Sequence, residues 1–169
     1  MSVEQAKDIV SLLPPLVAAV GLFVDAPESE IRGVLAQVRL DLLQFHGEET
    51  PEECRKYDIP YIKAVRVREG TNLLQYAAAY GDARALLLDT YKEGTAGGTG
   101  EVFDWNMIPG NMPKPVILAG GLNPANVAEA IRRVRPYAVD VSGGVEKSKG
   151  IKDAAQIAAF MQGVQDAAL

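Results

Sequence analysis

The sequence predicts an α/β fold in which parallel strands alternate with amphipathic helices in about six βα units. Six apolar runs rich in β-branched residues recur along the 169 residues, at 16–24, 40–45, 61–67, 85–88, 115–119 and 137–141. Strands that are apolar throughout are typical of a parallel sheet covered by helices. The runs begin roughly 21 to 30 residues apart, which is short for an open doubly wound sheet and suits a β/α barrel. We therefore expect one domain over residues 1–169.

Residue types that begin helices lie between these runs. Ser and Asp cap the first turn of a helix, a Gln three residues later completes a capping box, and Pro fits the first helical position. Apolar residues at helical spacing follow most of them. The predicted starts are Ser2 with Gln5, Pro27, Asp104 ahead of Trp105, Asn123-Pro124 and Asp153.

Composition and charge exclude several classes of function. The chain carries 17 Lys and Arg against 22 Asp and Glu, a net charge of −5, which argues against a nucleic-acid partner. Its apolar runs are too short to cross a bilayer, so no membrane partner is expected. One cysteine and one histidine leave neither an intrachain disulfide nor a Cys/His metal site. Because no signal-peptide pattern follows Met1, we expect a cytoplasmic protein.

The last two strands are each followed by a glycine pair, which predicts a phosphate site. Barrel enzymes carry their chemistry after the carboxyl ends of the strands, often with a phosphate site after the last two. Glycines let backbone amides approach an anion closely. One glycine pair would be explained by a tight turn, whereas two in neighbouring loops favour phosphate binding. The candidate phosphate-binding residues are Gly120, Gly121, Ser142, Gly143 and Gly144.

Asp89 ends an apolar strand and is the candidate catalytic residue. Burial disfavours the charged form of a carboxyl group and suits it to general acid catalysis. The alternative is a helix cap, but the residues after it lead into a glycine-rich segment at 94–100 that we interpret as a mobile lid. Asp89 is therefore expected to donate a proton to substrate.

Two further residues are candidates for substrate binding. His46, the only histidine, follows the second run and is either a proton carrier or a structural residue. Arg66 lies on the third run together with Lys63, and it either faces a substrate anion or makes a salt bridge within the barrel. Cys54 is expected on a helix away from the strand ends, where it is a poor nucleophile.

Five segments in chain order resemble the phosphoribosylanthranilate isomerase family. They read LQFHGEE at 43–49, LLDT at 87–90, GGTG at 97–100 with FDW at 103–105, LAGGLNP at 118–124 and VDVS at 139–142. The resemblance implies a (β/α)8 TIM barrel that acts in tryptophan biosynthesis without cofactor or metal. The implied reaction is an Amadori rearrangement of a small-molecule phosphosugar, N-(5′-phosphoribosyl)anthranilate, to 1-(2-carboxyphenylamino)-1-deoxyribulose 5-phosphate.

The resemblance also assigns roles to single residues. It implies that Asp89 protonates the ribose ring oxygen, and that Gln44, His46 and Asp140 surround the sugar and the anthranilate. Gly120, Gly121, Ser142 and Gly144 would hold the phosphate. Gly143 stands where the family usually has a second serine, which removes one hydroxyl and leaves the backbone amide.

The sequence departs from the family at its start. The family's first strand carries a Lys-x-Cys-Gly motif whose cysteine is the general base, and its second strand leads to an arginine that binds the anthranilate carboxylate. Met1 aligns just after that arginine, so the first strand, first helix and second strand are expected to be absent, leaving an incomplete TIM barrel over 1–169. We expect this chain to be inactive alone and to form a homo-oligomer through its exposed sheet edges.

Two other functions compete with the isomerase. One is a non-catalytic phosphate-binding or assembly module derived from the barrel, which would keep the glycine loops and lack turnover. The other is a different phosphosugar barrel enzyme such as indole-glycerol-phosphate synthase. That enzyme needs lysines and a glutamate at several strand ends, and Lys63 is the one lysine that suits this role.

Overall fold

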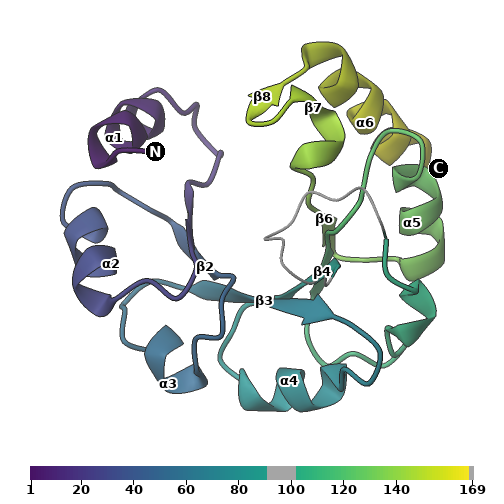
Figure 1. Cartoon of the computed structure of the whole chain (residues 1–169), viewed down its shortest axis with the longest axis horizontal. Coiled ribbons are helices and arrows are strands. Elements are labelled where there is room, and N and C mark those ends of the chain that lie inside the picture. The colour runs from purple at the N-terminus through teal and green to yellow at the C-terminus, as the bar shows by residue number, and fades with distance from the viewer. Residues whose placement is uncertain (91–101, 168–169) are drawn as a thin grey trace. The chain divides into compact units, whose positions relative to one another are not determined.

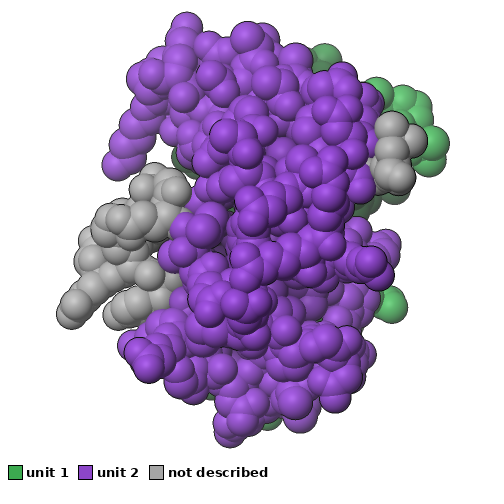
Figure 2. Space-filling view, turned by 90° about the vertical axis from the view of Figure 1, so that its right-hand side faces the viewer, with its two compact units in different colours: residues 1–64, 80–84 green, residues 65–79, 85–169 purple. Residues whose placement is uncertain are grey.

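A computed structural model describes residues 1–90 and 102–167 of the chain. The residues form two compact units, unit 1 of residues 1–64 and 80–84, and unit 2 of residues 65–79 and 85–169, which Figure 2 colours separately. Strand β3 runs through both units. The predicted lid at 94–100 lies outside the described residues.

Unit 1 is built from βα elements (Figure 1). Its elements in chain order are α1 (Val3–Ser11), β1 (Val20–Phe23), α2 (Glu28–Leu35), β2 (Leu42–Phe45), α3 (Pro51–Cys54) and the first part of β3 (Tyr61–Val67). The pairs β1–β2 and β2–β3 are parallel, with Val20 opposite Leu42 and Leu43 opposite Tyr61. The Phe45 ring packs against Tyr57 and edge-on against Tyr61, with centroids 6.0 and 5.7 Å apart.

Unit 2 continues the same alternation. Its elements are α4 (Leu73–Ala79), β4 (Leu86–Thr90), η1 (Trp105–Met107), β5 (Val116–Leu118), α5 (Val127–Val134), β6 (Ala138–Val139), η2 (Gly143–Val145), β7 (Glu146–Ser148), β8 (Ile151–Lys152) and α6 (Ala154–Ala167). The pairs β4–β5 and β5–β6 are parallel, while β7 and β8 form a separate antiparallel hairpin. Strand residues such as Leu88 and Leu118 share one buried core with Trp105 and with Val127 and Phe160 of the covering helices.

The six strands β1 to β6 follow one another in chain order across one sheet. This order confirms the predicted α/β class with a parallel sheet and about six βα units. It also places β1 and β6 at the two ends of the described sheet. On β1, Val20 and Leu22 are about half exposed, at 45% and 55%.

Several predicted boundaries are corrected by the structure. The run at 16–24 forms a strand only from Val20, because Leu16, which follows two prolines, takes a positive φ of 71° and is fully exposed. The strand begins where the Asp41 carboxylate accepts a hydrogen bond from the Ala19 amide (2.8 Å). The run at 137–141 pairs over Ala138–Val139 alone, as expected of a last strand with one neighbour in the described sheet.

Helix starts are predicted well where a side chain caps its own helix. The Ser2–Gln5 capping box is present, Asp153 caps α6, and the Asp104 carboxylate accepts from the Asn106 amide at the start of η1. Asn123-Pro124 does not open α5, which begins at Val127. Instead the Asn123 side chain closes a turn by accepting from the Ala125 amide (2.9 Å), which delays the helix by about one turn.

Candidate functional site

Asp89 lies inside strand β4 rather than after it, so it is not a helix cap. The residue is buried (8% exposed), and its Oδ1 accepts a hydrogen bond from the next amide, that of Thr90 (2.8 Å). Thr90, the next residue, is the last residue of β4. A carboxyl group buried at the carboxyl end of a parallel strand is where barrel enzymes place catalytic residues.

Gly120 brings the first predicted phosphate loop against this carboxyl group. Gly120 and Gly121 take positive φ angles of 76° and 68°, which favour glycine. A side chain at Gly120 would overlap the Thr90 backbone nitrogen and hydroxyl, and would press on Asp89 Oδ1. Glycine is therefore required because the β5 loop passes directly beside the candidate acid.

Two asparagines hold this loop in place from the start of α5. The side-chain amide groups of Asn123 and Asn126 both donate to the Gly121 carbonyl, at 3.3 and 3.0 Å. The Asn126 side chain also accepts from the Asn123 backbone amide (2.9 Å). These contacts explain why residues 123–126 form a turn, and they fix the backbone that follows the glycine pair.

The second predicted phosphate loop packs against the first. A side chain at Gly144 would overlap the Leu122 carbonyl, so the two loops meet backbone to backbone. Gly143 and Gly144 lie in η2, whose last turn closes when the Val145 amide donates to the Ser142 carbonyl (3.4 Å). The structure thus brings together, within unit 2, the two loops that carry the five predicted phosphate-binding residues, and it places Gly120 next to Asp89.

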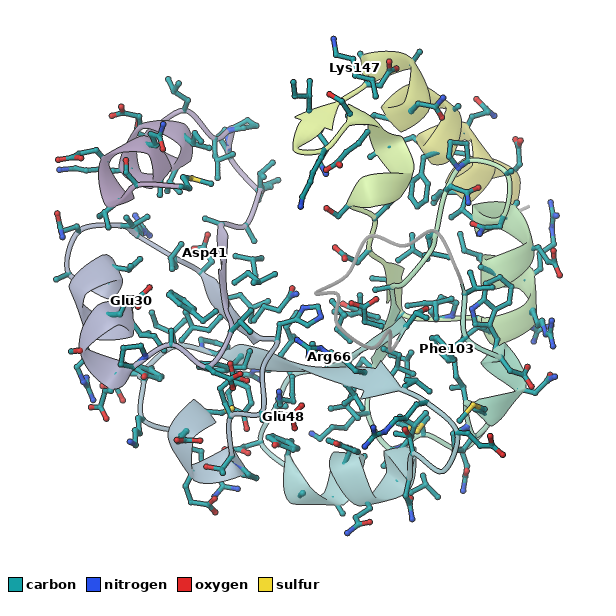
Figure 3. The ribbon with its side chains drawn as sticks, in the orientation of Figure 1. Glu30, Asp41, Glu48, Arg66, Phe103 and Lys147 are labelled. Carbon is teal, nitrogen blue, oxygen red and sulfur yellow. The ribbon has the colours of Figure 1, made fainter. Side chains whose placement is uncertain are left out.

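Asp140 and Arg66 are the other predicted site residues of unit 2. The Asp140 amide donates to the Leu118 carbonyl (2.8 Å), which places Asp140 just beyond the paired part of β6. Arg66 is partly exposed on β3 (Figure 3). Because Lys63 and Arg66 are three residues apart, they point to opposite faces of the strand and cannot act as a pair.

Gln44 and His46 lie together in unit 1 at the end of β2. The Gln44 side-chain amide is 3.0 Å from His46 Nδ1, and Gln44 is buried (8% exposed). The His46 backbone amide donates to the Phe23 carbonyl of the neighbouring strand (2.9 Å). The structure therefore joins these two predicted substrate-binding residues and anchors the loop that carries the histidine.

A buried ion pair next to this loop is missing from the sequence prediction. Lys63 and Glu49 are 2% and 6% exposed, and their charged atoms lie 3.1 Å apart. Lys63 Nζ also donates to the carbonyls of Phe45 and Gly47, at 3.3 and 2.6 Å. With its three N–H groups used in this way, Lys63 is a structural residue and not the catalytic lysine that a synthase would need.

Glu49, the partner of Lys63, also accepts hydrogen bonds from the backbone around the His46 loop. Its carboxylate accepts from the backbone amides of Asp25 (2.8 Å) and Gly47 (2.9 Å), and its carbonyl accepts from the Tyr80 hydroxyl (2.8 Å). A lysine inside an apolar strand was the one sequence signal for this network. Its partner could not be chosen from several nearby acidic residues.

Other features lie away from the predicted site. Cys54 is fully buried on α3, and burial raises the pKa of its thiol to about 12, in agreement with the prediction that it is a poor nucleophile. A cavity of about 400 Å³ in unit 2 lies at the amino ends of β5 and β6, lined in part by Trp105, Lys114 and Tyr137. Among residues 1–90 and 102–167, no His, Cys, Asp and Glu cluster suits a metal ion. Over the same residues, no helix is long and apolar enough to cross a membrane.

The chain has parallel βα units, with a buried carboxyl group and two glycine loops after the carboxyl ends of its strands. These features place it in the class of β/α enzymes. Comparison with known proteins then gives the family. The family model for N-(5′-phosphoribosyl)anthranilate isomerase matches residues 1–163. A relative of that name from Pseudomonas fluorescens (strain SBW25) is 58% identical over 98% of this chain and 79% of its own length. The chain belongs to the N-(5′-phosphoribosyl)anthranilate isomerase family, enzymes of tryptophan biosynthesis.

Solved structures agree with this assignment. The phosphoribosyl anthranilate isomerase of Thermotoga maritima is 40% identical, with a TM-score of 0.84 over 99% of this chain and 81% of that chain. A second isomerase structure, 39% identical with a TM-score of 0.82, covers 98% of this chain and 80% of its own, and contains reduced 1-(o-carboxyphenylamino)-1-deoxyribulose 5-phosphate. A further structure describes monomers of the dimeric Thermotoga enzyme, at 38% identity and a TM-score of 0.81. The parallel α/β fold of this chain therefore resembles the isomerase structures, over about four fifths of their length.

Proposed function

We propose that Asp89 is the general acid in the isomerisation of N-(5′-phosphoribosyl)anthranilate, and that the Gly120–Gly121 and Ser142–Gly144 loops hold the substrate phosphate. The contact of Gly120 with Asp89 carries this proposal. A phosphate bound on the glycine loops would set the attached ribose beside the acid, since one backbone loop contacts both. Backbone amides supply the attraction, which suits a chain of net charge −5.

The proposed chemistry begins with proton transfer from Asp89 to the ribose ring oxygen. The C1–O bond breaks as the nitrogen lone pair forms a C=N bond. Loss of the C2 proton to a base gives an enolamine. The 2-ketose forms when the base returns a proton to carbon 1 and the C2 hydroxyl gives its proton to the Asp89 carboxylate, which restores the acid. In the family this base is the cysteine of a Lys-x-Cys-Gly motif, which residues 1–169 do not contain.

We assign the remaining predicted residues on the same basis. We propose that Gln44 and His46, in unit 1, bind the sugar and the anthranilate. We propose the same role, on the family resemblance alone, for Arg66 and Asp140 in unit 2. The Gln44–His46 contact supports their acting as a pair. The match covers 79% of the length of the Pseudomonas relative, and we propose that the family's first strand, first helix and second strand have no counterpart in residues 1–169.

We also propose that residues 1–169 act as one incomplete barrel domain in the cytoplasm and associate into a homo-oligomer. The exposed apolar side chains of β1, such as Leu22 (55% exposed), support association through a sheet end. Because parallel edges with apolar side chains bind other chains readily, light scattering is expected to show species larger than a monomer. A stable monomer at high concentration would contradict this.

Turnover of N-(5′-phosphoribosyl)anthranilate, followed by its fluorescence, tests the catalytic assignment. Residues 1–169 alone are expected to be inactive, and fusing the unmatched segment of the Pseudomonas relative ahead of Met1 is expected to produce activity. In that fusion Asp89→Asn should lower turnover by about 10² to 10⁴-fold. The matched control is exposed Asp58→Asn, which should leave turnover unchanged. Normal turnover in the Asp89→Asn variant would refute the assignment of Asp89 as the general acid. If the fusion binds phosphate but shows no turnover, the result would favour a non-catalytic phosphate-binding module.

A further inference from the structure

Lys152 contacts the second phosphate loop at its first residue. From strand β8, Lys152 Nζ donates to the Ser142 carbonyl (2.9 Å), to Ser142 Oγ (3.1 Å) and to Glu146 Oε1 (2.8 Å). A lysine ammonium has three N–H donors and no acceptor. The three contacts therefore use its hydrogen-bonding capacity in full, and they join β8 to the loop ten residues earlier.

The contact with Ser142 Oγ determines what the serine hydroxyl can do. A hydroxyl has one donor and two acceptor positions. Because Ser142 Oγ accepts from Lys152, its own O–H must point away from the ammonium. The hydroxyl is thereby oriented as a donor, the role that a phosphate oxygen requires.

Glu146 holds the ammonium in place from the other strand of the hairpin. Its Oε1 accepts from Lys152 and its Oε2 accepts from the Gly150 amide (3.1 Å). The hydrogen bond from Lys152 lowers the pKa of Glu146 below its ordinary value, and the hydrogen bond from Gly150 lowers it further by a smaller amount. The Asp153 amide donates to the Val145 carbonyl (2.8 Å), so the hairpin is fixed at both ends.

We propose that Lys152 is a positioning residue of the phosphate site, which orients the Ser142 hydroxyl toward a phosphate monoester. The proposal rests on the proposed function, because it assumes that the Ser142 loop binds phosphate. Lys152 acts through Ser142 and not as a direct ligand, since its three N–H groups are used and Glu146 balances its charge.

The test is titration of residues 1–169 with inorganic phosphate and with ribose 5-phosphate at constant ionic strength, followed by calorimetry. Lys152→Met should weaken binding about fivefold to tenfold, the net effect of about one ordinary hydrogen bond. Ser142→Ala should have a similar effect. The double variant should bind no more weakly than Ser142→Ala alone, because Lys152 acts only through the hydroxyl that Ser142→Ala removes.

Two controls separate positioning from general damage to the hairpin. Lys147→Met removes an exposed lysine of the same hairpin, whose side chain lies on the outside of the molecule (Figure 3), and should bind as the original chain does. Lys152→Arg keeps donors for Ser142 and Glu146, and its affinity for phosphate should stay within about twofold of that of the original chain. Circular dichroism shows which variants are folded. If Lys152→Met is not folded, the double variant Lys152→Arg/Ser142→Ala takes its place. This double variant should bind phosphate as tightly as Ser142→Ala alone.

Each outcome decides the matter. If the original chain binds neither probe, the phosphate site itself is wrong and the inference falls with it. If the chain binds both probes and Lys152→Met binds equally well, the phosphate site stands and the positioning role is refuted. Losses that add in the double variant would also refute it, because the two residues would then act separately.

Discussion

Replacing Lys63 by methionine tests how strongly the buried ion pair holds unit 1 together. The substitution keeps the length and apolar stem of the side chain and removes its charge. It leaves the Glu49 carboxylate buried without its lysine, although the Asp25 and Gly47 amides still donate to it. It also removes the donor that satisfies the Phe45 and Gly47 carbonyls.

The expected cost follows from burial. Both side chains are nearly inaccessible, at 2% and 6%, and breaking such a pair from one side typically costs about 3–5 kcal/mol. That is a large part of the roughly 5–15 kcal/mol by which a domain is stable. At about 2–4 °C per kcal/mol for a chain of this size, the melting temperature should fall by about 6–20 °C.

Urea unfolding followed by circular dichroism measures this cost against a matched control. Lys56→Met breaks the ion pair of Lys56 with Glu28, whose side chains are 44% and 41% exposed, and should hardly move the unfolding midpoint because solvent screens an exposed pair. The double variant Lys63→Met/Glu49→Gln should recover part of the loss, since no unpaired charge then stays buried. Equal unfolding midpoints for the Lys63 and Lys56 variants would refute this account of the network.

Two further predictions concern single titratable groups. Cys54, buried and with a pKa of about 12, should not react with a thiol-specific disulfide reagent at pH 8 in the native chain and should react fully in urea, so rapid native labelling would contradict the burial. Glu146 should titrate below its ordinary value of 4.5 in carboxyl NMR, because hydrogen bonds from Lys152 and Gly150 favour its charged form. Its contribution to stability is therefore present above that ordinary value and is lost as the pH falls through the lowered pKa. Lys152→Met should move the titration upward, and an unchanged curve would contradict the contact.

Local features of the molecule were predictable because a few neighbouring residues decide them. The Ser2–Gln5 box and the Asp104 and Asp153 caps are formed by side chains within three residues of the amides they satisfy. Strand runs were recognisable because a parallel strand is buried on both faces and so is apolar throughout. Where a longer-range contact intervenes, as at Ala19 with Asp41, the predicted boundary was wrong.

The sequence by itself determined the class of fold, the family and the residues expected to bind phosphate. It did so because apolar periodicity, glycine pairs and family motifs are properties of short segments. Only the tertiary structure showed that Gly120 lies against Asp89, 31 positions earlier in the chain, and that Lys63 is neutralised by Glu49. The physical reason is that close packing and burial depend on which segments meet. A glycine, a lysine or a carboxylate takes its role from the atoms brought beside it, and those lie on strands and loops distant in the chain.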